Sequence, residues 1–201
     1  MKFTLTYEGP LRPQKKADVA HKHDIRTQLS QQLEMLWKYK PLSGVRELAF
    51  GERTADLAGN IRHQLDGTEP PKTDGWLIQR SGDYFLPIVL DQLEATASLS
   101  ITWFRQEEPG KILQVGDIDN RLKTLCDALQ VPPVGQLPAG GIGATRSSPF
   151  YCIFEDDALI SGFSIQTERL LKPSVGSQDV LLLIEVVTSV NEVQFGNMHL
   201  I

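Results

Sequence analysis

The sequence has few of the features that mark secreted, metal-stabilised or membrane proteins. Its 201 residues include only two cysteines, Cys126 and Cys152, and both lie within apolar patterns rather than in a CxxC motif. This spacing argues against a disulfide framework or a zinc site and favours buried free thiols. No apolar run approaches the about 18 residues of a membrane-spanning helix, and no charged-then-apolar leader stands at the start. We therefore expect a cytoplasmic chain that is neither exported nor inserted into a membrane.

Hydrophobic residues make up 41% of the chain, which is enough to bury a core in one domain. Alternating apolar residues predict strands, and apolar residues three and four positions apart predict helices. No internal repeat or low-complexity tract interrupts these patterns. We expect strands at 2–7 and 95–105, helices at 17–37 and 119–130, a broken helix at 45–65, a β-hairpin of 76–80 and 84–90, and two paired strands at 159–171 and 179–188.

The chain also lacks the basic excess that is typical of nucleic-acid-binding proteins, since its net charge is −5. The charge is unevenly distributed, however. Residues 1–46 carry nine basic and four acidic side chains, a balance of +5, so the remainder carries −10. We expect the polar face of the helix at 17–37 to present His21 and His23 with nearby basic residues. The candidates for phosphate contacts in this region are Arg12, Lys15, Lys16, Lys22 and Arg26.

A glycine-rich run, Gly140-Gly141-Ile142-Gly143, invites comparison with nucleotide-binding loops, and the spacing fails in both cases. A phosphate loop requires GxxxxGK[ST], and no lysine follows the run. A dinucleotide-binding fingerprint requires a preceding strand and a third glycine, and Arg146 occupies that place. We interpret the loop 131–148 as a flexible connector.

Two acidic clusters are the chemically informative feature of the sequence. The first places Asp117, Asp119, Asn120 and Lys123 at the start of the helix at 119–130, and the second, Glu155-Asp156-Asp157, follows the apolar run 150–154. Carboxylates at a helix N-terminus are also ordinary capping residues. Five acids brought together without a cation would repel one another, whereas Mg²⁺ prefers such oxygen ligands. The clusters therefore predict a hard divalent metal site.

Two other classes of acidic site were compared with the spacing of these carboxylates. An EF-hand counted from Asp117 would need glycine and glutamate where Leu122 and Ala128 stand, so that motif is excluded. Acids alone do not exclude a glycosidase pair, but clustered carboxylates beside a lysine suit magnesium and a phosphoryl centre better. Lys123 lies four residues after Asp119, where it could contact phosphate or form an ordinary salt bridge to Asp119.

The combination Asp-x-Asp-Asn-x-x-Lys-x-x-x-Asp-Ala-Leu, at 117–129, followed by Asp156-Asp157-Ala158, resembles the RusA-type Holliday junction resolvases. The resemblance implies an α/β (α+β) fold with a mixed β-sheet flanked by helices. It implies one domain over 1–201, with 1–75 as an N-terminal extension and 76–190 as the catalytic core. It also implies a homodimer that cleaves branched DNA with Mg²⁺ or Mn²⁺. The residues carried over are the catalytic set Asp117, Asp119, Lys123 and Asp157 (or Asp156), with metal ligands drawn from Asp117, Asp119, Asp156 and Asp157.

The chain departs from the small members of that family in several ways. It has the extension before Trp76, an acidic net charge, a longer loop at 131–148, and Val115-Gly116 where bulky residues stand in the family. The first hypothesis is a metal-dependent endonuclease acting on branched DNA. One alternative is a non-catalytic DNA-structure-binding protein that uses its basic N-terminal third, and another is a phosphohydrolase acting on a small phosphate ester.

Overall fold

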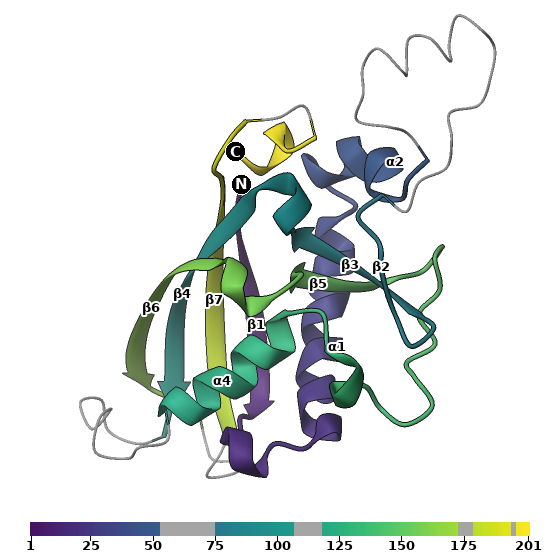
Figure 1. The fold of residues 1–201 in the computed structure, drawn as a ribbon. Coiled ribbons are helices and arrows are strands. Elements are labelled where there is room, and N and C mark those ends of the chain that lie inside the picture. The colour runs from purple at the N-terminus through teal and green to yellow at the C-terminus, as the bar shows by residue number, and fades with distance from the viewer. Residues whose placement is uncertain (53–74, 107–117, 173–178, 194–195) are drawn as a thin grey trace, which may run out of the picture.

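The protein combines two β-sheets with helices in a mixed α+β fold (Figure 1). The computed structural model describes residues 1–52, 75–106, 118–172, 179–193 and 196–201. Within them the strands are β1 (Lys2–Pro10), β2 (Ile78–Arg80), β3 (Asp83–Val89), β4 (Ala95–Arg105), β5 (Phe150–Phe154), β6 (Ile160–Arg169) and β7 (Asp179–Val190). The α-helices are α1 (Val19–Leu36), α2 (Arg46–Ala49) and α4 (Ile118–Leu129), and short 3₁₀ helices include η1 (Gln14–Lys16), η4 (Val134–Gln136), η5 (Asp157–Leu159) and η6 (Met198–Leu200).

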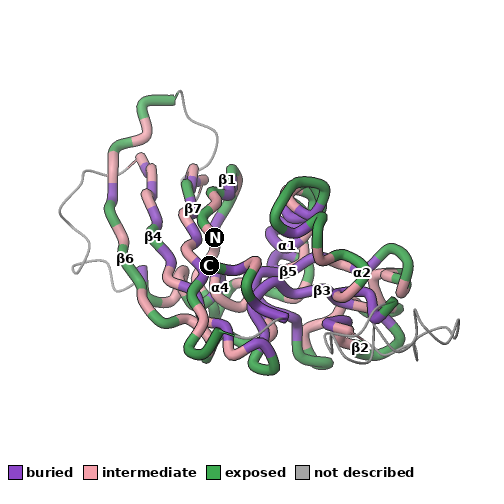
Figure 2. Tube along the Cα trace, turned by 90° about the horizontal axis from the view of Figure 1, so that it is seen from above, coloured by how far each residue is buried: buried purple, intermediate pink, exposed green. Residues whose placement is uncertain are grey.

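The larger sheet has the strand order β1-β7-β4-β6. Viewed from above, these strands stand in a row, and α1 lies beyond β1 (Figure 2). β7 is antiparallel to both β1 and β4, whereas β6 is parallel to β4, with Ile101 opposite Ile184 on one side and Ile165 on the other. The prediction that the strands at 159–171 and 179–188 pair with each other is therefore wrong. Their apolar patterns identify them as strands but do not show that β4 separates them.

The smaller sheet, β2-β3-β5, contains the predicted hairpin. β2 pairs antiparallel with β3, and β3 pairs parallel with β5. The glycine-rich run is fastened to this hairpin, because the buried carboxylate of Asp83 accepts hydrogen bonds from the backbone N–H groups of Ile142 and Ala144, each at 2.9 Å. A Cβ on Gly141, whose φ is +77°, would lie 2.8 Å from Oδ2 of Asp83. The run thus binds a carboxylate of its own chain and is more than a connector.

The hydrophobic core joins the two sheets through α1. Alternate residues of β4, including Leu99, Ile101 and Trp103, are buried, as their spacing predicts. The helix α1 packs against β1, β5 and α4, and its apolar stripe of Ile25, Leu29 and Leu33 is buried. The expected N-terminal extension therefore contributes β1 and α1 to the same core as the later strands. Among the described helices, none has the length and apolar character needed to cross a bilayer.

The C-terminal residues close the end of the core where β7 finishes. Thr188 donates from its hydroxyl to the carbonyl of Leu200 at 2.5 Å, and the buried amide of Asn197 donates to the carbonyl of Leu93 at 2.8 Å. Between them the imidazole of His199 stacks on Trp76, with ring centroids 4.9 Å apart. Neither ring nitrogen of His199 has a hydrogen-bond partner among the described residues. Burial, helped by the positive chain amino group, lowers the pKa of His199 to about 4.

The partly buried His199 ring, whose nitrogens are inaccessible, predicts a specific acid sensitivity. The folded-state pKa lies below the ordinary value of 6.5, so the unfolded chain binds the extra proton and stability falls as the pH drops from about 6.5 to about 4. His199→Phe keeps the stacking on Trp76 and cannot be protonated. We expect urea denaturation at pH 8 to give nearly equal stabilities, and the variant to lose less stability than wild type by pH 4, by up to about 3 kcal/mol. Parallel losses in both proteins across this range would contradict the assignment.

Candidate functional site on helix α4

The helix α4 carries the first acidic cluster on its outer face. Its apolar stripe of Leu125, Ala128 and Leu129 is buried, so the helix forms where the periodicity predicts it. Asp119 and Lys123 are exposed and lie one turn apart on the same face. No ion pair joins these two described side chains, so the simple salt-bridge interpretation of Lys123 is not supported. Asp117 lies outside the described residues.

The second acidic cluster is built as a tight turn after β5. The backbone N–H of Glu155 donates to the carbonyl of Val89 at 2.9 Å, and its carboxylate accepts from the N–H of Asp91 at 3.1 Å. The carboxylate of Asp156 caps η5 by accepting from the N–H of Ala158 at 2.9 Å. Glu155 and Asp156 therefore have structural tasks, which leaves Asp157 as the better candidate ligand of the pair.

A side-chain hydrogen bond links the residue after α4 to the second acidic cluster. Gln130, the residue after α4, accepts the backbone N–H of Asp157 on its Oε1 at 2.9 Å. The N–H of Val131 also donates to the carbonyl of Phe154 at 2.9 Å, which aligns the end of α4 with the end of β5. As a result η5 lies beside the C-terminal half of α4 (Figure 1).

The electrostatics of Asp157 reflect this position. Burial raises the pKa of the Asp157 carboxyl, and the carboxylates of Asp156 and Asp127 raise it further. The thiol of Cys126 lies in the same field: burial, with Asp157 and Asp127, raises its pKa to about 11. The charged form of Asp157 is thus disfavoured by its neighbours, and a cation would relieve that repulsion.

The structure brings the two clusters to the same helix but to different turns of it. Asp157 lies near Cys126 and Asp127, whereas Asp119 precedes Cys126 by seven residues, or about 10 Å along the helix axis. In the described ranges, no group of three His, Cys, Asp or Glu side chains is close enough to hold a metal ion. The convergence of Asp117, Asp119 and Asp157 on one cation therefore stays a prediction.

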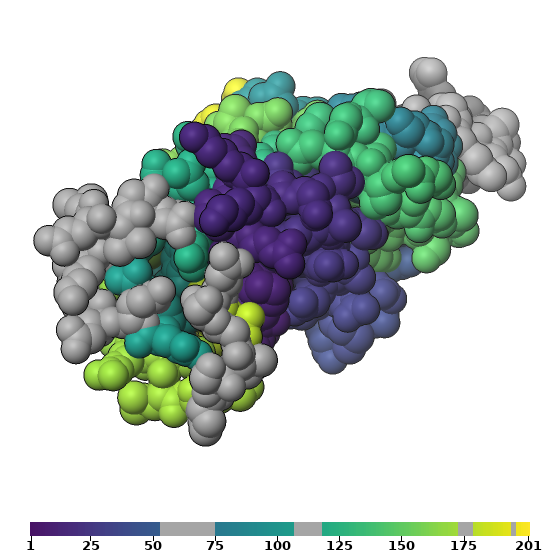
Figure 3. Space-filling model, turned by 90° about the horizontal axis from the view of Figure 1, so that it is seen from below, coloured from purple at the N-terminus to yellow at the C-terminus, as the bar shows by residue number. Residues whose placement is uncertain are grey.

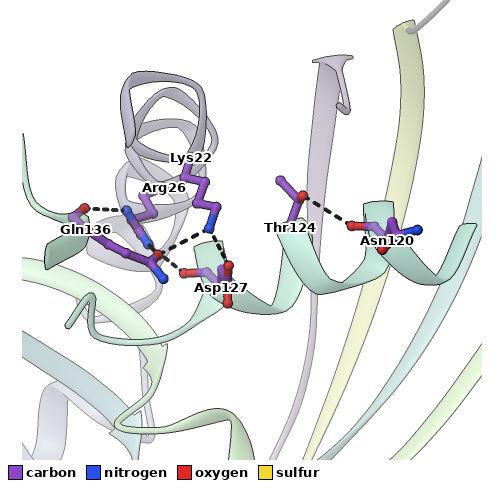
Figure 4. Close-up of polar contacts among 6 residues, drawn as sticks. All are labelled: Lys22, Arg26, Asn120, Thr124, Asp127 and Gln136. Carbon is purple, nitrogen blue, oxygen red and sulfur yellow. Dashed lines mark hydrogen bonds and ion pairs between the residues drawn. The ribbon is translucent and has the colours of Figure 1, made fainter. Parts of the chain in front are cut away.

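A buried polar network attaches α4 to α1 (Figure 4). Nζ of Lys22 lies 2.5 Å from Oδ2 of Asp127, and both side chains are almost fully buried. Arg26, which is 2% exposed, donates to the backbone carbonyl of Asp127 at 2.8 Å and to the side-chain and backbone oxygens of Gln136. The network fixes the C-terminal half of α4, and η5, which begins at Asp157, packs against this helix.

The network corrects the proposed set of phosphate-binding residues. Lys22 and Arg26 were expected on the solvated face of α1, and this expectation is wrong because both side chains are buried against α4. A sequence signal was present, since positions 22, 26, 29 and 33 form one helical stripe with the buried leucines. His21 is buried as well, and it accepts from the backbone N–H of Arg12 at 3.2 Å.

The remaining basic candidates precede α1. Lys15 and Lys16 are exposed on η1, and Arg12 is half-buried. The helix η1 packs directly against α4, so these lysines adjoin the helix that carries Asp119 and Lys123. Figure 3 shows the N-terminal residues, in purple, as a continuous surface across the lower side of the molecule. This arrangement places the positive charges of Lys15 and Lys16 beside α4.

Comparison with known proteins gives no match: no protein-family model, no curated protein and no solved structure matches the chain significantly.

Proposed function

We propose that the protein is a metal-dependent endonuclease that cleaves branched DNA as a homodimer, as its resemblance to the RusA-type resolvases implies. The observation that carries the proposal is the hydrogen bond from the N–H of Asp157 to Gln130. It brings the second acidic segment against the helix that bears Asp119 and Lys123, although about thirty residues separate the two segments in the sequence. This contact is observed in space and is independent of the sequence motif that suggested the proposal.

The chemistry of the carboxylate donors, rather than an assembled group of ligands, supports a hard divalent cation. Asp119 and Asp157 offer carboxylate oxygens without sulfur or imidazole ligands, and the raised pKa of Asp157 reflects a surplus of negative charge that Mg²⁺ or Mn²⁺ would offset. Asp119, Asp157 and Asp117 would hold the ion. When bound, it would supply an activated water and stabilise negative charge on the phosphate.

The basic side chains around α4 have distinct tasks in this proposal. Lys123, exposed one turn along α4 from Asp119, would donate to a non-bridging oxygen of the scissile phosphate and stabilise charge that develops during cleavage. Lys15 and Lys16 on the adjoining η1 would bind neighbouring phosphates and hold the DNA. The first interaction concerns the rate of cleavage and the second concerns affinity.

The proposal is tested by a cleavage assay on a mobile four-way junction, a flap and a plain duplex, each with Mg²⁺, with Mn²⁺ and with EDTA. We expect metal-dependent cleavage of the branched substrates and none with EDTA. Binding of junctions without cleavage under any divalent metal would replace the proposal with a DNA-structure-binding protein. Hydrolysis of a small phosphate ester alone would instead indicate a phosphohydrolase.

A matched pair of variants separates the two acids of the second cluster. Asp156→Asn keeps a side-chain oxygen that can cap Ala158, whereas Asp157→Asn removes the carboxylate that lies near α4. We expect 5 mM Mg²⁺ to raise the melting temperature of wild type and Asp156→Asn, because a ligand that binds only the folded state stabilises it. The rise should vanish in Asp157→Asn. A Mg²⁺-dependent rise that is lost in Asp156→Asn and kept in Asp157→Asn would reverse the assignment.

A further inference from the structure

An open groove runs between β1 and α1, which lies beyond β1 in the row of strands (Figure 2). Its volume is about 590 Å³. The strand lines it with side chains of its exposed face, and the helix lines it with three carboxamides and a thioether. These lining residues are Thr6, Glu8, Gln28, Gln31, Gln32 and Met35. None of them belongs to the acidic clusters.

The groove follows the free edge of the larger sheet, because β1 is an edge strand in the order β1-β7-β4-β6. Gln32 accepts from the N–H of Thr6 at 2.9 Å and donates to the carbonyl of Thr6 at 2.7 Å. Both backbone groups of Thr6 therefore point away from β7 and toward α1. These directions alternate along a strand, so the backbone groups of Thr4 and Glu8 also face the free edge.

The carboxamide of Gln32 takes the place of a peptide group of a neighbouring strand. Accepting from and donating to one residue is what a hydrogen-bonded partner in an antiparallel strand does. Both bonds are exposed, and the same carboxamide donates to the carbonyl of Gln28 at 3.2 Å, which offers it a partner within α1. Exposed edge strands pair readily with extended chains. A side chain that can swing away thus holds a position that a peptide backbone fits.

The two ends of the groove differ in charge. Since α1 runs back along β1 (Figure 1), Glu8 lies toward Asp24, which is exposed one turn before Gln28 on the same face of α1. Glu8 pairs with Lys172, but both side chains are more than half exposed, whereas Asp24 has no ion pair among the described residues. The opposite end presents the exposed Met35. The groove therefore complements a basic group at one end and an apolar group at the other.

We propose that this groove binds an extended peptide of a partner protein, which adds to the free edge of β1 as a strand and displaces the carboxamide of Gln32 from Thr6. The peptide carries a lysine or arginine at the end near Asp24 and an apolar side chain at the end near Met35. Its backbone hydrogen bonds supply affinity, and these two side chains supply direction and specificity. The inference is independent of the proposed nuclease activity.

The test selects peptides from a random library displayed on phage against the full chain, and then measures a selected synthetic peptide by fluorescence anisotropy. We expect the selected peptides to share a basic and an apolar residue separated by a β-forming stretch. N-methylation at alternate positions removes the N–H groups on one side of an extended strand. One alternate set should lower the affinity at least about tenfold and the other should leave it unchanged. Equal effects of both sets, or no selected peptide, would overturn the proposal.

Variants of α1 test the chemistry of the groove with the same peptide. Asp24→Lys should lower the affinity about three- to tenfold. The matched control Glu34→Lys reverses another exposed acid of α1, outside the lining of the groove, and should keep the wild-type affinity. Gln32→Ala removes the competing carboxamide and should raise the affinity at least about twofold. Equal losses in the two charge reversals, or weaker binding by Gln32→Ala, contradict the assignment.

Two other occupants of the groove predict different results. A second copy of the chain would give a dimer in sedimentation equilibrium that Thr6→Pro dissociates, because this variant removes an N–H of the free edge and keeps the ladder to β7. A DNA backbone is disfavoured beside Glu8 and Asp24. A four-way junction should therefore not displace the peptide. Dissociation of such a dimer, or displacement by the junction, would replace the peptide with that occupant.

Discussion

Replacing Lys22 with methionine is expected to lower the free energy of unfolding by about 3–5 kcal/mol, because it leaves a buried carboxylate without its counter-charge. Nζ of Lys22 lies 2.5 Å from Oδ2 of Asp127, and the two side chains are 8% and 13% exposed. Arg26 contacts the backbone carbonyl of Asp127, so its hydrogen bond does not replace the lost pairing of the carboxylate. Urea denaturation at neutral pH measures the change.

Two comparisons isolate the buried pair. Lys38→Met removes an exposed pair between Glu34, in the last turn of α1, and Lys38, just after the helix, at 3.3 Å, and should change stability by less than about 0.5 kcal/mol. The double variant Lys22→Met with Asp127→Leu removes both charges and should recover most of the loss, since an apolar pair of similar volume needs no desolvation of ions. A double variant as unstable as Lys22→Met would show that the loss arises from packing rather than from the unpaired charge.

The sequence predicted most of the elements because their signals are local. The periodicity of α4 and the alternation of β4 locate both elements, and the short turn between β2 and β3 identifies the hairpin. Strand pairing is not local, so the position of β4 between β6 and β7 could not be read from either strand's own pattern. Of the broken helix expected at 45–65, α2 forms at Arg46–Ala49, residues 50–52 turn away from helix, and residues 53–65 lie outside the described residues.

In the candidate site, too, the local features were predictable from the sequence and the long-range contacts were not. Four-residue spacing places Asp119 and Lys123 on one exposed face of α4, as the structure has them. The contact between Gln130 and Asp157 joins the end of a helix to the turn after a strand, and no periodicity signals it. The role of Asp83 was missed for the same reason, because its partners are backbone N–H groups about sixty residues later.

The error at Lys22 and Arg26 has a different physical origin. Both residues lie on the apolar stripe of α1, and a charged side chain on such a stripe requires a buried partner. Asp127 and Gln136 are those partners, and they come about a hundred residues later in the chain. A basic residue within an apolar stripe therefore indicates an internal ion pair as readily as a binding surface. Lys22 lies on such a stripe and is buried, whereas Lys15 lies outside it and is exposed.

Lys123→Ala is expected to reduce the rate of junction cleavage by about 10²- to 10³-fold while leaving junction affinity within about threefold of wild type. The ammonium group is exposed on α4 without an ion pair to Asp119, so it is available to a phosphate. In the proposed mechanism it acts on charge that grows during cleavage, which affects the transition state more than the bound state. Single-turnover cleavage at saturating protein, with affinity measured separately by fluorescence anisotropy, separates the two effects.

The matched variant Lys15→Ala with Lys16→Ala should behave in the opposite way. These exposed lysines adjoin α4 on η1, where we expect them to bind phosphates remote from the scissile bond. Cleavage at saturating protein should persist, whereas affinity should fall and the log–log salt dependence should flatten by about 0.9 for each lost contact on duplex DNA. If Lys123→Ala cuts and binds as wild type does, Lys123 has no part in catalysis. If the Lys15 and Lys16 variant also keeps its full salt dependence, the DNA lies on another surface of the protein.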